Sequence, residues 1–221
     1  LAKNGESFYM FAPHTVYKEY GVTLDDLNLD EYYDDLVANP NIEKKSKDAR
    51  EMLNLIAQTQ LQSGYPYLMF KDNANRVHPN ANIGQIKMSN LCTEIFQLQE
   101  TSVINDYGVE DDIKRDISCN LGSLNIVNVM ESGKFRDSVH TGIDALTVVS
   151  DEANIQNAPG VKKANNELHS VGLGAMNLHG YLAKNKISYE SEEAKDFANV
   201  FFMMMNYYSL ERSMQTAVSY T

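Results

Sequence analysis

The chain has 221 residues, 43% of them hydrophobic, which is enough for one large domain or two small ones and excludes a wholly disordered protein. Its formal net charge of −11 argues against a nucleic-acid-binding surface, because such a surface needs clustered lysine and arginine side chains. The chain shows neither the run of roughly 20 apolar residues that spans a membrane nor a signal-peptide pattern. We therefore expect a cytoplasmic protein that binds neither nucleic acid nor membrane.

The apolar residues predict an α/β fold in which helices outnumber strands. The acidic run at residues 25–35 predicts a solvated face, because its carboxylates alternate with leucine and tyrosine. Helical spacing of apolar side chains then predicts an amphipathic helix over residues 44–63, ended by Gly64 and Pro66. The short aromatic run at residues 65–70 predicts a buried strand.

The second half of the chain continues with a strand predicted at residues 124–130 and helices predicted at residues 137–157 and 162–184. The glycines inside residues 162–184 weaken a helix and indicate close packing against another element. A last helix is predicted to begin at Glu192 behind the cap residue Ser191. Its core-facing stripe is expected to contain Ala194, Phe197, Ala198, Phe201, Phe202, Met205 and Tyr208.

Residues 89–95 (SNLCTEI) place an amide, a thiol and a carboxylate at alternate positions: Asn90, Cys92 and Glu94. Alternate side chains of an extended chain share one face, but Asn90 and Glu94 would then lie ~13 Å apart, at ~3.3 Å per residue. In a regular helix Asn90 and Glu94 would align and Cys92 would point away. The segment must therefore curl into a compact loop if all three side chains are to meet one small substrate.

The chemistry of this triplet favours a neutral thiol. A neighbouring carboxylate disfavours the thiolate of Cys92, and no histidine lies nearby in the sequence to offset it. This argues against a cysteine hydrolase and suits hydrogen-atom transfer, with Glu94 as a general base on a hydroxyl group. Taken alone, the triplet is also compatible with a buried cysteine in a strand next to a surface glutamate.

Several separate motifs, in one order, resemble the large catalytic subunit of class I ribonucleotide reductases, and their wording is most similar to the bacterial class Ib enzymes. The motifs are YPYLMF at residues 65–70, KDN at 71–73, Asn75, Pro79, GQI at 84–86, SNLCTEI at 89–95, CNLGSLN at 119–125 and HSVGLGAMNLHGYLA at 169–183. The resemblance implies that residues 1–221 are a central, incomplete segment of a ten-stranded α/β barrel. Residues 84–96, approximately, would form the finger loop inside that barrel.

The resemblance also implies roles for individual residues. Cys92 would carry a thiyl radical that abstracts the 3′ hydrogen of a ribonucleoside diphosphate, in a site that excludes water. Glu94 would accept the proton of the 3′ hydroxyl, and Asn90 would hydrogen-bond the ribose hydroxyls. Cys119 would be one of the two thiols that supply electrons when the 2′ hydroxyl leaves as water. The isolated chain, which lacks the second reducing cysteine and the phosphate site, is expected to be inactive.

The resemblance implies no directly bound cofactor and no metal site in this chain, and none of the five histidines has a metal-ligand spacing such as HxxxH. The radical would come from a small partner subunit with a metal and a tyrosyl radical. Nucleoside triphosphate effectors would bind outside this segment, a thioredoxin- or glutaredoxin-like protein would reduce the enzyme, and the full subunit would form a homodimer. Such an enzyme makes deoxyribonucleotides for DNA replication.

Two alternatives remain at this point. One is a non-catalytic interaction domain that keeps the motifs by descent. The other is a cobalamin-dependent or glycyl-radical relative, which also uses a cysteine on a finger loop.

Overall fold

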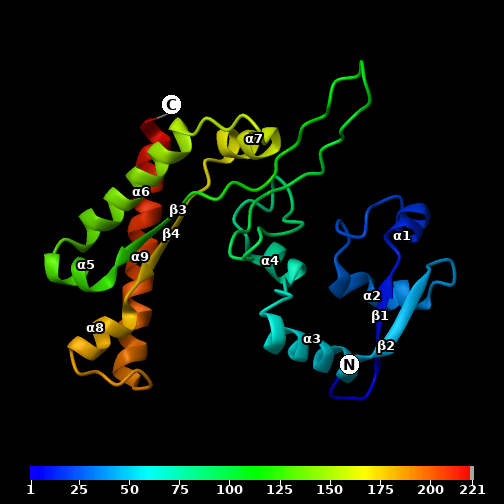
Figure 1. The fold of residues 1–221 in the computed structure, drawn as a ribbon, viewed down its shortest axis with the longest axis horizontal. Helices are drawn as coiled ribbons and strands as arrows, with labels where there is room; N and C mark the ends of the chain where they lie inside the picture. Colours follow the sequence, from blue (N-terminus) through cyan, green and yellow to red (C-terminus); the bar gives the residue numbers. More distant parts are fainter. Residues whose placement is uncertain (220–221) are drawn as a thin grey trace. The chain divides into compact units, whose positions relative to one another are not determined.

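The computed structural model describes residues 1–219 and divides the chain into two compact units, Leu1–Glu100 and Thr101–Thr221 (Figure 1). Each unit has a two-stranded sheet and several helices, so the predicted helix-rich α/β class is confirmed. The assignment of residues 1–221 to one barrel segment stays a prediction, and its last two residues lie outside the described part. No helix within residues 1–219 is long and apolar enough to cross a membrane.

The first unit is built on an antiparallel strand pair and a small apolar core. Its elements are β1 (Ser7–Phe11), α1 (Pro13–Tyr20), α2 (Leu29–Ala38), β2 (Lys44–Asp48), α3 (Ala49–Ser63) and α4 (Lys71–Val77). β1 pairs with β2 along its whole length. The core consists of the buried side chains of Val16, Leu27, Leu36 and Ile42, which come from α1, α2 and the adjoining loops.

The helix predicted over residues 44–63 is only partly correct, because its first five residues form β2. Lys44 leaves the helical pattern to bind the end of α2, where its Nζ donates to the carbonyl oxygens of Leu36, Val37 and Asn39. α3 starts behind Asp48, whose carboxylate accepts from the backbone N–H groups of its first turn at 2.9 Å. Such an Asp N-cap followed by an acidic third residue is a sequence signal for this boundary.

The strand predicted at residues 65–70 is wrong. The segment has no regular secondary structure, and its aromatic side chains are exposed, with Phe70 at 70%. A strand requires a hydrogen-bonded neighbour, and none of the described residues supplies one to this segment. An apolar run alone therefore did not identify a buried strand.

The second unit contains a parallel strand pair connected by helices. Its elements are β3 (Leu121–Asn125), α5 (Ile126–Ser132), α6 (Phe135–Glu152), α7 (Pro159–Leu168), β4 (Gly172–Met176), α8 (Leu178–Lys184) and α9 (Glu192–Ser219). β3 runs parallel to β4, with Leu121 opposite Gly172 and Asn125 opposite Met176. Parallel strands need a long crossover, and α5, α6 and α7 supply it.

Two predicted elements of this unit are wrong. The expected strand at residues 124–130 spans the end of β3 and the start of α5, and Asn125 marks the change by accepting from the N–H of Asn128. The expected helix at residues 162–184 is split into α7, β4 and α8. A β-carbon on Gly172 would lie 2.6 Å from the Leu121 side chain, so the glycine belongs to a close strand contact.

The predicted helices at residues 137–157 and from Glu192 onward are confirmed as α6 and α9, with slightly different bounds for the first. The Ser191 hydroxyl accepts from the N–H of Ala194, which confirms the cap. Phe201 and Met205 of α9 pack with Ile126 and Val139 in the core of the unit. Phe202 is 44% exposed, so its predicted place in the buried stripe is wrong.

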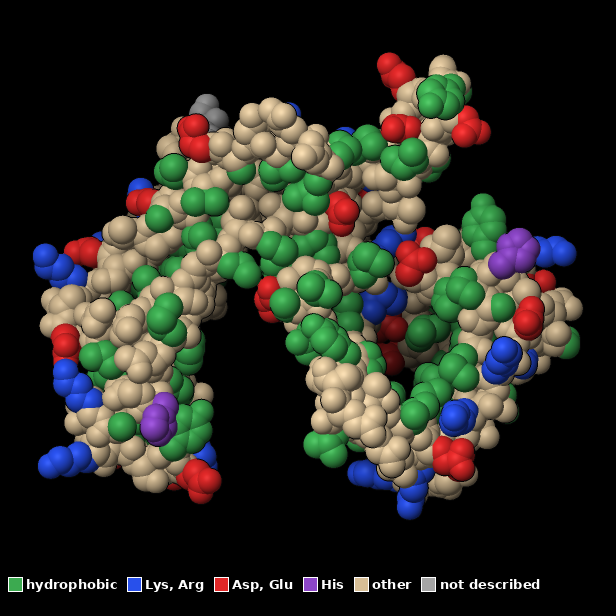
Figure 2. Space-filling model, in the orientation of Figure 1, with side chains coloured by type: hydrophobic (Ala, Val, Ile, Leu, Met, Phe, Trp, Pro, Cys, Tyr) green, Lys and Arg blue, Asp and Glu red, His purple; other side chains and the backbone are tan. Residues whose placement is uncertain are grey.

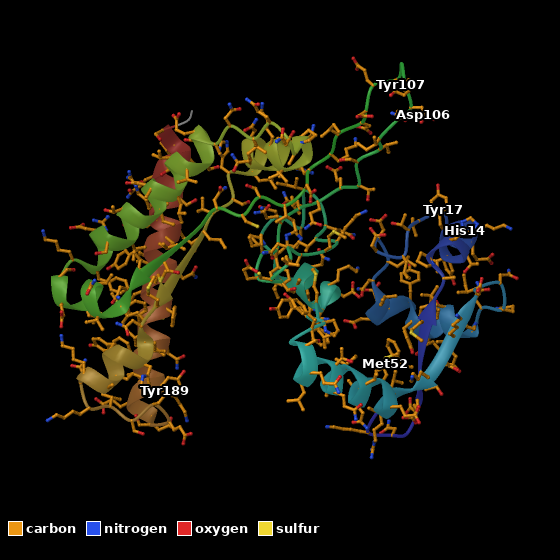
Figure 3. The ribbon with its side chains drawn as sticks, in the orientation of Figure 1. His14, Tyr17, Met52, Asp106, Tyr107 and Tyr189 are labelled. Carbon is orange, nitrogen blue, oxygen red and sulfur yellow. The ribbon has the colours of Figure 1, made fainter. Side chains whose placement is uncertain are left out.

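Apolar side chains are exposed on the visible surface of each unit (Figure 2). The segment before β3 forms a projecting turn, held at its base by two hydrogen bonds between the backbones of Val103 and Asp112. Asp106 and Tyr107 lie at its tip (Figure 3).

Candidate functional site

The loop that carries Cys92 follows α4 and has no helix or strand between residues 78 and 100. Its tip is a tight turn in which the N–H of Thr93 donates to the carbonyl oxygen of Asn90 at 3.1 Å. Thr93 has a φ of 65°, in the left-handed region, which an L-residue rarely adopts. This turn replaces both the fully extended and the helical conformation of the segment.

The turn brings Asn90 and Glu94 into direct contact. The Asn90 Nδ2 donates to the Glu94 Oε1 at 2.8 Å, and the Asn90 Oδ1 accepts from the N–H of Ile95 at 3.1 Å. The Ser89 hydroxyl donates to the carbonyl oxygen of Ile95 at 2.6 Å and closes the loop below the turn. Residues 89–95 thus form a compact turn, the conformation required if Asn90 and Glu94 are to meet one substrate, and these two side chains lie together.

Cys92 lies within this turn, between the two residues that touch. Its side chain is exposed, as are those of Leu91 and Glu94, with Leu91 at 80%. Residues 1–100, the unit that contains this turn, therefore do not by themselves form the water-excluding surroundings that we expected for Cys92.

The base of the loop is held by residues for which the sequence predicted no role. Asn75 on α4 forms two hydrogen bonds with the backbone of Ile86: its Nδ2 donates to the carbonyl oxygen at 2.7 Å, and its Oδ1 accepts from the N–H at 2.8 Å. The buried Gln99 donates from Nε2 to the carbonyl oxygen of Met88 at 2.7 Å. These side-chain amides form hydrogen bonds with backbone N–H and C=O groups of the loop. No helix or strand is present there to satisfy those groups.

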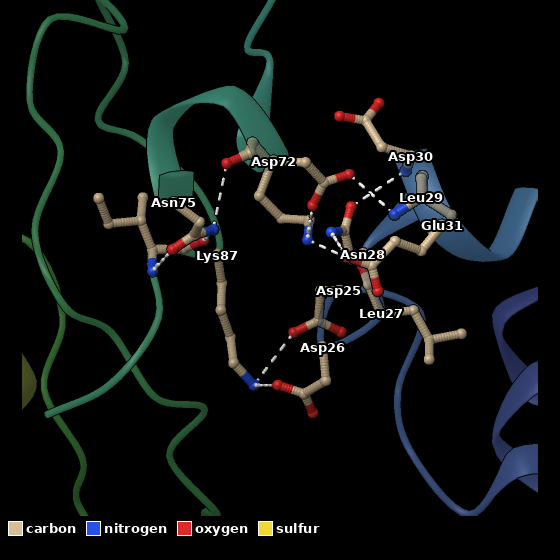
Figure 4. Close-up of polar contacts among 12 residues, drawn as sticks. Asp25, Asp26, Leu27, Asn28, Leu29, Asp30, Glu31, Asp72, Asn75 and Lys87 are labelled. Carbon is tan, nitrogen blue, oxygen red and sulfur yellow. Dashed lines mark hydrogen bonds and ion pairs between the residues drawn. The ribbon is translucent and has the colours of Figure 1, made fainter. Parts of the chain in front are cut away.

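Charged residues from the acidic run also hold the loop base (Figure 4). Lys87 Nζ lies 2.7 Å from a carboxylate oxygen of Asp26 and 3.2 Å from one of Asp25. The hydrogen bond from Lys87, together with one from Thr23, lowers the pKa of Asp26. Burial alone lowers the pKa of Lys87, but its hydrogen bonds to Asp26 and Asp25 outweigh burial and raise it. The first two residues of the segment 25–35, which we predicted to form a solvated face, are thus in ion pairs with Lys87.

We expect Lys87→Met to weaken the acid dependence of folding. A lowered pKa in the folded state means that the contribution of Asp26 is present above the ordinary carboxyl pKa of about 4 and is lost as pH falls through the folded-state pKa. Because Asp26 is 38% exposed, the effect should stay below about 1 kcal/mol. Urea unfolding midpoints of the complete protein at about pH 6 and pH 3.5 measure this loss.

The drop in midpoint between these two pH values should be smaller in Lys87→Met than in the unsubstituted protein. Lys45→Met is the matched control, because Lys45 is an exposed lysine on strand β2 of the same unit. Equal drops in all three proteins would contradict this role for Lys87.

Cys119 lies in the second unit, two residues before β3, and its side chain is exposed. Its neighbour Ser118 is buried, at 3% exposure, and Asn120 begins the contact with β4 through a 2.8 Å hydrogen bond from the N–H of Gly172 to its carbonyl oxygen. The backbone is thus anchored on both sides of an accessible thiol.

Two of the histidines lie against carboxylates. His140 lies 3.0 Å from a carboxylate oxygen of Glu211, and His169 lies 3.2 Å from one of Asp151. Within residues 1–219, no group of three or more His, Cys, Asp or Glu side chains is arranged to hold a metal ion.

Comparison with known proteins gives one consistent result. A family described as "Ribonucleotide reductase, barrel domain" matches residues 1–220. The chain is 52% identical to the ribonucleoside-diphosphate reductase subunit alpha of Bacillus subtilis, over 98% of this chain and 31% of that protein. It is 45% identical to the subunit of that name from Mycoplasma pneumoniae, over 99% and 30%. The Treponema pallidum subunit is 31% identical, over 96% and 27%.

Proposed function

Because the chain belongs to the ribonucleotide reductase barrel-domain family, as its motifs indicated, we propose that it supplies the radical cysteine and one reducing cysteine of a ribonucleoside-diphosphate reductase. The chain spans about 30% of the length of the curated relatives it matches. The activity proposed is therefore that of the longer protein, the conversion of ribonucleoside diphosphates to deoxyribonucleoside diphosphates.

The contact between Asn90 and Glu94 around Cys92 carries this proposal. An amide and a carboxylate 2.8 Å apart offer a donor and an acceptor to the two neighbouring hydroxyls of one ribose. The sulfur of Cys92, in the same turn, must reach a C–H bond of that sugar. This requires the reacting atoms to be held about 3–3.5 Å apart. Because Asn90, Cys92 and Glu94 belong to one short turn, few rotatable bonds separate their functional groups, and their relative positions are restricted.

In the proposed reaction, the thiyl radical of Cys92 removes the 3′ hydrogen atom, which leaves a radical on C3′ and restores the Cys92 S–H bond. The carboxylate of Glu94 takes the proton of the 3′ hydroxyl. The 2′ hydroxyl accepts a proton from one of the two reducing thiols, the C2′–O bond breaks, and water leaves. Asn90 holds the hydroxyl groups while their charge changes.

Two thiols, one of them Cys119, then reduce the sugar: they give two electrons and a hydrogen to C2′ and end as a disulfide, while Glu94 returns its proton to the 3′ oxygen. The hydrogen atom then returns from Cys92 to C3′, which regenerates the thiyl radical. A thioredoxin- or glutaredoxin-like dithiol reduces the disulfide by thiol–disulfide exchange before the next turnover. The exposed side chain of Cys119 agrees with such a role.

The remaining partners follow from the family. A small subunit with a metal and a tyrosyl radical supplies the radical to Cys92, the large subunit works as a homodimer, and nucleoside triphosphate effectors bind outside this segment. The test is to combine the complete protein with its small subunit, a dithiol reductant and a ribonucleoside diphosphate, and to measure deoxynucleotide formation. Its absence under these conditions would contradict the proposed activity.

We expect Glu94→Gln in the complete protein to lower kcat by about 10²- to 10³-fold, because the amide cannot accept the proton of the 3′ hydroxyl. KM should change little, since glutamine keeps an oxygen that can accept from Asn90. Steady-state kinetics measure both constants. Glu100→Gln serves as control, because Glu100 is an exposed glutamate at the end of the same loop. Equal kcat values for Glu94→Gln and the unsubstituted enzyme would remove Glu94 from the mechanism.

A further inference from the structure

A buried asparagine on α7 connects the two residues that flank Cys119. Asn165 is 1% exposed, and its Oδ1 accepts three hydrogen bonds. They come from the Ser118 hydroxyl at 2.9 Å, the Asn120 Nδ2 at 2.8 Å and the Ser150 hydroxyl at 3.1 Å. Its own Nδ2 donates to the carbonyl oxygen of Ser150 on α6.

A buried amide destabilises a protein unless its donors and acceptors are satisfied. Here both ends of the Asn165 amide have partners, and Ser118 and Ser150 are themselves at most 3% exposed. A leucine at position 165 would leave these hydroxyls without their acceptor, which makes the arrangement sensitive to substitution. The network therefore fixes the backbone where it passes through residues 118–120.

This fixed backbone continues into the sheet. The Asn120 Nδ2 also donates to the carbonyl oxygen of Ser170 at 3.1 Å, and β3 pairs with β4 from Leu121 onward. The residue before Cys119 and the residue after it are thus tied to α7 and to the start of β4. Cys119 itself keeps an exposed side chain.

We propose that Asn165 is a positioning residue for Cys119, and this inference rests on the proposed role of Cys119 as a reducing thiol. A thiol that must meet both a substrate and an external dithiol needs an accessible sulfur on a backbone that does not move. Asn165 supplies the second condition without touching the substrate, because it acts through Ser118 and Asn120.

Two serines offer a matched test. Ser118→Ala and Ser150→Ala each remove one buried hydroxyl that donates to the same oxygen of Asn165, but only Ser118 adjoins Cys119. In the complete reductase with its small subunit and a dithiol reductant, both should lower the melting temperature. Only Ser118→Ala should lower kcat, by about tenfold, since a displacement of about 1 Å at a reacting group costs up to ~10²-fold.

Asn165→Leu should have a larger effect than either serine variant, because it removes the acceptor of Ser118 and of Asn120 together. Asn166→Leu is the control on the same helix, because Asn166 is exposed. KM for the ribonucleoside diphosphate should stay within about twofold in all variants, since the loss is in positioning rather than in ground-state binding. The rate of product formation in a single turnover without external reductant should fall in proportion to kcat.

The inference is overturned if Ser118→Ala and Ser150→Ala lower kcat equally, or if folded Asn165→Leu keeps the kcat of the unsubstituted enzyme. Cys119→Ser, measured alongside, separates this failure from that of the proposed function. If Cys119→Ser sustains multiple turnovers, the role of Cys119 itself is wrong. If Cys119→Ser stops turnover while the Asn165 and Ser118 variants keep the kcat of the unsubstituted enzyme, only the positioning role is wrong.

Discussion

Cys92→Ser in the complete reductase should abolish deoxynucleotide formation. The O–H bond of serine is much stronger than the S–H bond of cysteine, so a radical cannot be passed to this position at a useful rate. An increase of only about 7 kcal/mol in the barrier already corresponds to about 10⁵-fold in rate. The measurement is deoxynucleotide formation with the small subunit present, at substrate concentrations that saturate the unsubstituted enzyme.

The control for this prediction is substrate binding. Asn90 and Glu94 contact each other without the sulfur, through their own 2.8 Å hydrogen bond, so the serine variant should keep the affinity for a ribonucleoside diphosphate. Binding within about threefold, with no turnover, would place the loss in the chemistry rather than in the fold. Appreciable turnover by Cys92→Ser would end the radical proposal.

Cys119→Ser should prevent repeated turnover while leaving the first hydrogen abstraction intact. Serine cannot form the disulfide that accounts for the two electrons of the reduction, so no external dithiol can restore the enzyme. Product formation is measured over time with excess reductant and should not exceed a single turnover. A linear time course comparable to that of the unsubstituted enzyme would show that the electrons come from elsewhere.

The two cysteine variants therefore fail at different steps. Ser213→Ala, on α9 and away from both motifs in the sequence, is a suitable reference for the effect of a substitution as such. Loss of 3′ hydrogen abstraction in Cys92→Ser, but not in Cys119→Ser, is the pattern that assigns different roles to the two thiols.

The sequence shows the residue types of the site, and the spacing of Asn90 and Glu94 required a compact loop if both were to meet one substrate. The conformation itself could be inferred only as a requirement, because the tight turn depends on Thr93 adopting a φ of 65°. The amino-acid composition of the segment does not predict this φ value for Thr93. The same holds for the exposure of Cys92, which depends on what surrounds the loop.

The incorrect secondary-structure predictions have a common physical cause. Residues 44–48 and 172–176 became strands because a distant strand pairs with them, and residues 65–70 did not because no such partner is among the described residues. The supporting roles of the Asn75 and Asn165 amides could not be predicted from the sequence for a similar reason. Each is an ordinary helical asparagine in the sequence. Only the fold brings Asn75 to the backbone of Ile86 and Asn165 to the side chain of Asn120.

The most direct test of the account is the fate of a tritium label at C3′ of a ribonucleoside diphosphate in the complete enzyme. If the sulfur at position 92 removes this atom, incubation with the small subunit should release part of the label to water. Cys92→Ser should release none, and Cys119→Ser should still release it. Release from the Cys92→Ser enzyme, or none from the unsubstituted enzyme while it makes product, would contradict the account.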